Sequence, residues 1–238
     1  MEPSLPPAPA PDPDFDPDPG LARDPGHRPA DRSARLSVRS AAHRTVALVN
    51  ALTLYGSHAT GEDDGKADSK ADSEGPAPLP APDTVAGVLL AHGEPGPVQL
   101  SADDIAEMRT AALLLREVFA APDVDTAAAG LNRLLRRSTG TVRLTSHNGL
   151  TDWHPHLDSD DEAPWGEWLL ASSCLALTVL IWDHQRPPGG LCASPSCRNV
   201  FLTQGGGPAR RYCSRRCATR ERVAAHRRDA HRRAARPA

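Results

Sequence analysis

The chain has 238 residues, of which 39% are hydrophobic, and its formal net charge is -3 at pH 7. That length suits one ordinary domain with a small appendage, or two small domains. The first residues are acidic and proline-rich and lack the basic and apolar segments of a secretory signal. The longest apolar run, at about 169–182, is interrupted by Ser172 and Ser173 and is too short to span a bilayer. We therefore expect a soluble cytoplasmic protein with no membrane partner.

The charge is distributed unevenly along the chain. Eleven arginines lie within 209–238 against only Glu221 and Asp229, so this segment carries +9 and the rest carries -12. A basic tail on an acidic body predicts that this end binds a polyanion, of which nucleic acid is the commonest. Binding of the tail to the acidic body of the same chain stays open at this point.

The first part of the chain is predicted to be helical apart from two low-complexity stretches. Residues 1–40 carry Pro-Asp repeats and predict a disordered tail, and a flexible insertion is expected at about 57–82. Apolar residues recur at helical spacing between and after these stretches. Helices are expected at 41–55, from Asp83 to Leu90, from the N-cap Ser101 to Pro122, from Asp123 or Asp125 to Gly140, and over 162–183.

One β-hairpin interrupts this helical pattern. Residues 141–145 and 150–157 alternate in polarity on either side of His147-Asn148-Gly149. An Asn-Gly pair between two alternating runs is a strong hairpin signal. Pro187-Pro188-Gly189-Gly190 then reads as a linker.

Four of the five cysteines fall close together, at Cys192, Cys197, Cys213 and Cys217. Two close pairs separated by a short loop suit a tetrahedral Zn²⁺ ion, and a reducing compartment favours a metal over disulfides. The segment has few apolar residues, so a metal that contributes on the order of 10–16 kcal/mol could fold it where burial could not. We expect one structural zinc ion. Cys174, on the long apolar helix, is expected to be a small buried hydrophobe.

An arginine-rich helix is predicted to follow, with Ser214 as its N-cap. Arginine pairs bidentately with phosphate or with guanine. DNA is the expected partner, with RNA left open and a nucleoid association when DNA is bound. The predicted nucleic-acid contacts are Arg210, Arg211, Arg215, Arg216, Arg220, Arg222, Arg227 and Arg228.

The predicted architecture is mainly α with one β-hairpin (α+β). A helical N-terminal domain over 41–186 precedes a small treble-clef-like C-terminal zinc finger over 187–238. Asn50 is expected to be a satisfied buried polar group, and Trp153, Trp165, Trp168 and Trp182 are expected in the core.

The C-terminal segment resembles the CGNR zinc-finger family. The matching stretches are Leu191-Cys-Ala-Ser-Pro-Ser-Cys197, Val200-Phe201, Arg210-Arg-Tyr-Cys-Ser214, Cys217-Ala-Thr-Arg220 and Arg222-Val-Ala-Ala-His-Arg227. Residues 41–186 resemble the ABATE domain that lies upstream of such fingers, through Val49-Asn50-Ala-Leu and Leu113-Leu-Leu-Arg116. The resemblance implies a transcriptional regulator linked to stress. Two departures are Cys-Ala-Thr-Arg in place of Cys-Gly-Asn-Arg, and a second cysteine pair that is one residue closer than is usual.

Three other functions stay open on the sequence. The basic tail suits acidic protein surfaces as well as nucleic acid, and the helical domain suits a homodimer or a small-molecule effector. His154 and His156, two apart on a strand, face the same way and could hold a catalytic metal. Polar residues crowd this hairpin, but the chain has no established catalytic motif, so we expect no enzyme. The crowded residues are His147, Asp152, His154, His156, Asp158, Asp160, Asp161 and Glu162.

Overall fold

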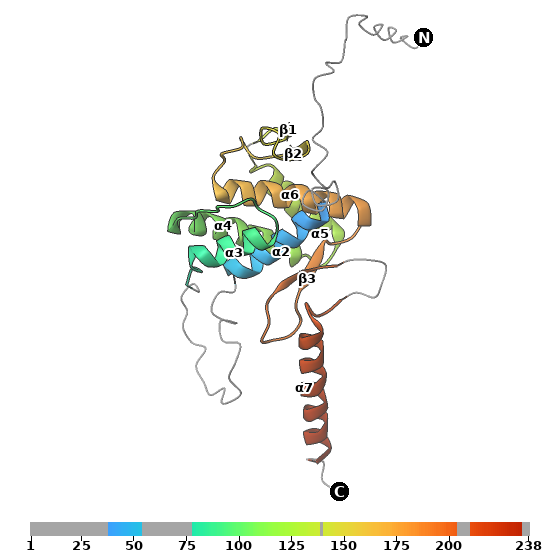
Figure 1. The fold of residues 1–238 in the computed structure, drawn as a ribbon. Coiled ribbons are helices and arrows are strands. Elements are labelled where there is room, and N and C mark those ends of the chain that lie inside the picture. The colour runs from blue at the N-terminus through green and yellow to red at the C-terminus, as the bar shows by residue number, and fades with distance from the viewer. Residues whose placement is uncertain (1–37, 54–77, 139, 204–209, 235–238) are drawn as a thin grey trace, which may run out of the picture.

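The computed structural model describes residues 38–53, 78–138, 140–203 and 210–234. The predicted N-terminal tail and the predicted insertion at about 57–82 lie mostly outside the described residues, but residues 38–40, which were predicted to belong to the disordered tail, are helical. The rest forms six helices and two short antiparallel strand pairs, which confirms the mainly helical α+β class (Figure 1). The helices are α2 (Val38–Thr53), α3 (Pro82–Ala91), α4 (Ala102–Phe119), α5 (Val124–Leu135), α6 (Trp165–His184) and α7 (Arg215–Ala234). The strands are β1 (Arg143–Thr145), β2 (His154–His156), β3 (Gly189–Leu191) and β4 (Val200–Leu202).

The helical body is built around α4 and α6, with α2 and α5 packed against both of them. Each of these helices turns a face of apolar side chains into one shared core, which is what drives the packing. The largest fully buried side chains in it include Leu48, Leu52, Met108, Leu115, Phe119, Leu169 and Leu177.

Local sequence sets where the helices begin. Ser101 caps α4 through a capping box, in which its hydroxyl accepts from the Asp104 N–H and the Asp104 carboxylate accepts from the Ser101 N–H. Asp123, and not Asp125, caps α5 by accepting from the Thr126 N–H. The predicted start of α6 at 162 is wrong by three residues, because the residue before Pro164 is driven away from helical geometry.

The expectation that the apolar run at about 169–182 is too short to span a bilayer is wrong, because α6 is 20 residues long and, by length and composition alone, apolar enough to cross a membrane. It packs against α2, α4 and α5, as the core helix of a helical bundle does. A helix that is apolar all round does not reveal which side is buried. Trp182 near its end is 72% exposed, as is Trp153 in the hairpin, so the prediction that all four tryptophans lie in the core is wrong. Trp165 and Trp168 do pack against the core.

The hairpin pairs as predicted but is shorter, with β1 and β2 joined by residues 146–153. The turn lies where the sequence places it, since His147, Asn148 and Gly149 all have positive φ. A second strand pair, β3 with β4, replaces the linker predicted at Gly189-Gly190.

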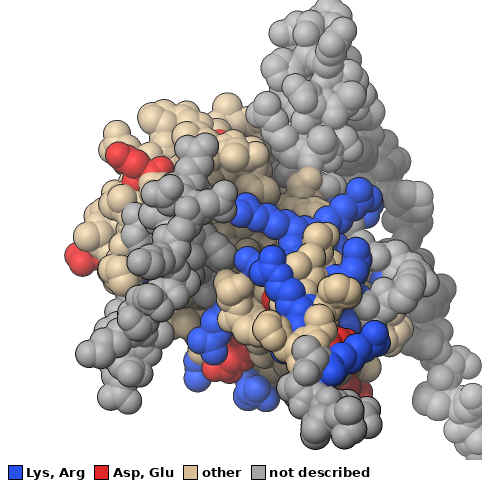
Figure 2. All heavy atoms as spheres, turned by 90° about the horizontal axis from the view of Figure 1, so that it is seen from below, with Lys and Arg blue, Asp and Glu red and all other residues tan. Residues whose placement is uncertain are grey.

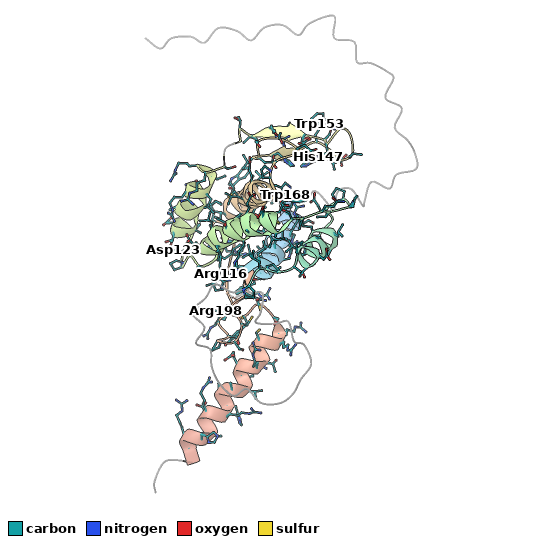
Figure 3. All side chains as sticks on the ribbon, turned by 90° about the vertical axis from the view of Figure 1, so that its left-hand side faces the viewer. Arg116, Asp123, His147, Trp153, Trp168 and Arg198 are labelled. Carbon is teal, nitrogen blue, oxygen red and sulfur yellow. The ribbon has the colours of Figure 1, made fainter. Side chains whose placement is uncertain are left out.

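This second strand pair is joined to the helical body. Val200 and Leu202 of β4 belong to the same buried cluster as the helices. The side chain of Asn50 accepts from the Val200 N–H at 2.8 Å and donates to the Val200 carbonyl at 3.1 Å. Arg116 of α4 donates to the carbonyl of Arg198, and the two arginines lie at the junction between body and finger (Figure 3). Asn50 is thus a satisfied polar group, as predicted, and its partner lies in the finger.

Candidate zinc centre and basic helix

The four clustered cysteines converge on one point. Cys192 follows β3, Cys197 precedes β4, Cys213 lies just before α7, and Cys217 lies in the first turn of α7. Their sulfur atoms all lie within 4.8 Å of one another, and the Cys197–Cys213 and Cys213–Cys217 Sγ distances are 3.6 and 3.7 Å. Zinc–sulfur bonds of about 2.3 Å in a tetrahedron require sulfurs about 3.8 Å apart. The cluster therefore fits one Zn²⁺ with all four positions filled by protein.

Backbone hydrogen bonds of the finger hold the cysteines in place. The Cys197 N–H donates to the Ser194 carbonyl at 2.9 Å and closes the first turn. The Ala193 N–H donates to the Arg211 carbonyl at 2.8 Å and brings the two halves of the finger together. The Cys217 N–H donates to the Ser214 hydroxyl at 3.2 Å, so Ser214 starts α7 as predicted and fixes Cys217 in the first turn.

Donors around the sulfurs suit thiolate ligands. The Cys213 N–H points at the Cys192 Sγ and the Arg220 guanidinium points at the Cys217 Sγ, both at 3.5 Å. Burial raises the pKa of the Cys213 thiol, whereas the hydrogen bond from Ser214 lowers the pKa of Cys217. A coordinated dication deprotonates its thiol ligands outright, which overcomes the effect of burial.

Comparison with known families supports this reading of the geometry. Residues 190–230 match the CGNR zinc finger family. This segment is a zinc-binding module that holds a single structural Zn²⁺. No curated protein matches the chain. The family match does not extend to residues 41–186, so the ABATE-like character of the helical body stays a prediction.

The two departures from the family pattern are compatible with this site. The shortened Cys213–Cys217 spacing still brings the two sulfurs to 3.7 Å from each other, with Cys213 just before α7 and Cys217 in its first turn. Ala218, where the family has Gly, is half-buried within α7 and favours the helix. Arg220 keeps its position and donates to the hydroxyl of Ser194 at 3.0 Å.

The predicted nucleic-acid residues fall into two groups. Arg210 donates to the Cys213 carbonyl and Arg211 lies over Tyr212, so these two, with Arg220, also contact the finger itself. The others are exposed, and within the described part of the chain the side chains of Arg215, Arg216, Arg222 and Arg227 form no hydrogen bond or ion pair. Figure 2, seen from the α7 end, shows Lys and Arg side chains spreading outward over this end.

A contact between α7 and the loop that joins Cys192 to Cys197 could not be predicted from the sequence. The buried hydroxyl of Ser194 donates to Glu221 at 2.6 Å and accepts from Arg220. These two hydrogen bonds hold the second turn of α7 against the turn between Cys192 and Cys197. By contrast, Val223, two residues further along α7, is 45% exposed.

The hairpin histidines are also brought together. His147, His154 and His156 lie with their ring nitrogens within 4.8 Å of one another. Asp158 and Asp161 contact these rings, whereas the Asp160 carboxylate accepts from the Glu162 N–H.

Proposed function

We propose that this protein binds nucleic acid, in the first place DNA, through α7, and acts as a transcriptional regulator in the cytoplasm. The observation that carries the proposal is the placement of α7. Its first turns contact the zinc finger, and the remainder extends away from the body (Figure 1). The arginines along this remainder are exposed. Among the described elements, α7 packs against no other helix or strand.

The chemistry of α7 favours a polyanion over an apolar partner. The helix carries eight arginines and has Val223 as its only large apolar residue. A helix that docks in a hydrophobic groove needs apolar anchors at i, i+3, i+4 and i+7, and α7 has none of these patterns. Its 20 residues span about 30 Å, and an α-helix fits the major groove of B-DNA. Arginine can there pair with phosphates or with guanine.

The salt dependence of DNA binding tests the proposal. Affinity should fall linearly on a log–log scale, with a slope of about -0.9 for each phosphate neutralised. Arg222→Ala with Arg227→Ala should weaken binding to all sequences and reduce the slope by about 2. A matched control, Arg136→Ala with Arg137→Ala, removes the same charge from exposed positions at the end of α5 and should leave the slope unchanged.

The alternative function is binding to an acidic protein surface through the same arginines. Selection from a random nucleic-acid pool, with and without chelator, separates the two functions. Enrichment that is lost with the Arg222→Ala, Arg227→Ala variant supports a regulator. If the protein retains no nucleic acid at low salt, the proposal is overturned and binding to an acidic protein surface remains as the function.

A further inference from the structure

Three imidazoles meet at the hairpin, at the opposite end of the molecule from α7 (Figures 1 and 3). The Nε2 of His154 lies 3.2 Å from the Nε2 of His147 and 3.0 Å from the Nε2 of His156. His154 and His156 project from one face of β2, while Pro155 between them is exposed. His147 reaches the other two from the turn, where its backbone has φ 47°. A left-handed conformation in a residue other than glycine is often retained for a functional purpose.

Each imidazole also lies close to an oxygen acceptor through its other ring nitrogen, Nδ1. The Nδ1 of His156 lies 2.8 Å from an Asp158 carboxylate oxygen, and the Nδ1 of His154 lies 2.8 Å from the Asp152 carbonyl. The Nδ1 of His147 lies 3.5 Å from the Asp161 carboxylate. The two close acceptors require a proton on the Nδ1 atoms of His154 and His156, and the nearby Asp161 carboxylate favours one on the Nδ1 of His147. This leaves the Nε2 lone pairs facing one another.

A second layer fixes the two carboxylates. Arg143 of β1 contacts Asp158 at 2.8 Å and Asp161 at 2.6 Å, and the Thr145 hydroxyl donates to Asp161 at 2.9 Å. Asp158 is 2% exposed, so its charge is retained by these partners and by His156. Carboxylates that orient imidazoles in this way are typical of metal-binding histidines.

Hydrogen bonds among the three imidazoles cannot satisfy all three Nε2 atoms at once. Because the Asp152 carbonyl can only accept, the Nε2 of a neutral His154 has a single lone pair and no proton. Two neighbouring Nε2 atoms lie at hydrogen-bond distance from it, and one lone pair cannot accept fully from both. Protonation of both neighbours would place two imidazolium ions side by side. A cation at the centre instead satisfies all three Nε2 lone pairs at once.

We propose that His147, His154 and His156 bind a second divalent transition metal, Zn²⁺ in the first place, separate from the cysteine site. Zinc–nitrogen bonds of about 2.0–2.1 Å in a tetrahedron place nitrogens about 3.3 Å apart, close to the observed spacings. Three protein ligands leave one position for water or a small exogenous ligand. The proposal does not rest on nucleic-acid binding.

Metal content of the full chain tests the site. After loading with Zn²⁺ and passage through metal-free buffer, the wild type should hold two zinc ions per chain. His154→Ala and His147→Ala should each hold one, with unchanged circular dichroism. The control His184→Ala removes an exposed histidine at the end of α6 and should hold two. One zinc in the wild type, or two in His154→Ala, would overturn the proposal.

X-ray absorption at the zinc edge gives a readout that does not depend on a variant. The wild type should show a nitrogen shell at about 2.0–2.1 Å beside the sulfur shell at about 2.3 Å. His154→Ala should show sulfur alone. A pure sulfur shell in the zinc-saturated wild type would mean that only the cysteine site binds metal.

A substitution at Asp158, the carboxylate that orients His156, gives a second and milder test of the site. Asp158→Asn should weaken zinc binding at the histidine site by about 10–100-fold in competition with a chromophoric chelator. Asp160→Asn is its matched control, since this exposed carboxylate contacts no histidine and should leave the affinity unchanged. Equal affinities for the two variants would show that Asp158 does not orient a metal ligand.

Discussion

Asn50 connects α2 to β4 by satisfying both backbone groups of Val200 with one side chain. An amide suits this role because it offers a donor and an acceptor side by side, as a neighbouring strand would. The contact bridges residues 150 apart in the chain, so it fixes the finger against the body at the level of single atoms.

Asn50→Ala should lower the free energy of unfolding by about 1–3 kcal/mol, because it leaves the buried Val200 N–H and carbonyl without partners. Urea denaturation measures this change. Thr53→Ala, on the same helix, is the control, since its hydroxyl bonds only to the Val49 carbonyl of its own helix. Equal losses in the two variants would contradict the bridging role of Asn50.

The five thiols should react in two classes. Cys174 is fully buried and burial raises its pKa to about 12, so it carries almost no thiolate at neutral pH. We expect that a brief exposure to a thiol reagent titrates no cysteine in the zinc-loaded protein, four after chelation, and all five after denaturation. Reaction of Cys174 in the chelated but undenatured protein would contradict its inert role.

At the scale of elements, the finger divides into a part that depends on zinc and a part that does not. Cys192, Cys197 and Cys217 form a small cluster with little apolar area of their own, whereas Val200 and Leu202 belong to the core of the helical body. The metal therefore stabilises the cysteine turns and the start of α7, while β4 is stabilised by burial.

Removal of zinc by a strong chelator should unfold α7 and the cysteine turns and leave α2, α4, α5 and α6 folded. Hydrogen exchange is the suitable measurement, because it reports each segment separately. Protection should disappear over 212–234 and persist in α4 and α6. Concerted loss of protection in the whole chain would show that zinc also holds the helical body together.

The pairing of β3 with β4 requires a glycine at 189. A Cβ there would overlap the Phe201 carbonyl oxygen and lie 2.8 Å from Cδ1 of Phe119. Gly189→Ala should destabilise the protein by about 1–3 kcal/mol through this overpacking. Gly87→Ala, in α3, meets no atom within 4 Å and should stabilise by about 0.5–1 kcal/mol through higher helix propensity. Thermal melts distinguish these opposite signs.

Across the whole molecule, the parts predicted correctly from sequence are those specified locally. The capping box at Ser101, the turn at His147-Asn148-Gly149 and the cysteine spacing each lie within a few residues, where the chemistry of neighbouring side chains decides the conformation. The start of α6 is also local, since Pro164 keeps the residue before it out of helical geometry and the helix begins at Trp165.

Contacts between segments that are far apart in the chain could not be predicted from the sequence. Nothing in the sequence near Asn50 indicates that its partner is Val200. Because α6 is apolar all round, its sequence does not indicate that Trp182 lies outside the core. The sequence paired His154 with His156 through strand alternation. It could not bring His147 to them, because that approach depends on the backbone path of the turn.

Helix α7 is anchored at one end, and its like charges repel one another along its length. Arg216 and Arg220 are spaced i and i+4, where equal charges destabilise a helix by about 0.2–0.5 kcal/mol per pair. Arg228 and Arg232 share this spacing, although the ion pair between Arg232 and Asp229 offsets part of their repulsion. Added salt screens this repulsion and favours the helical form of the free protein. The same salt weakens attraction to a polyanion, so ionic strength acts on this segment in two opposite directions.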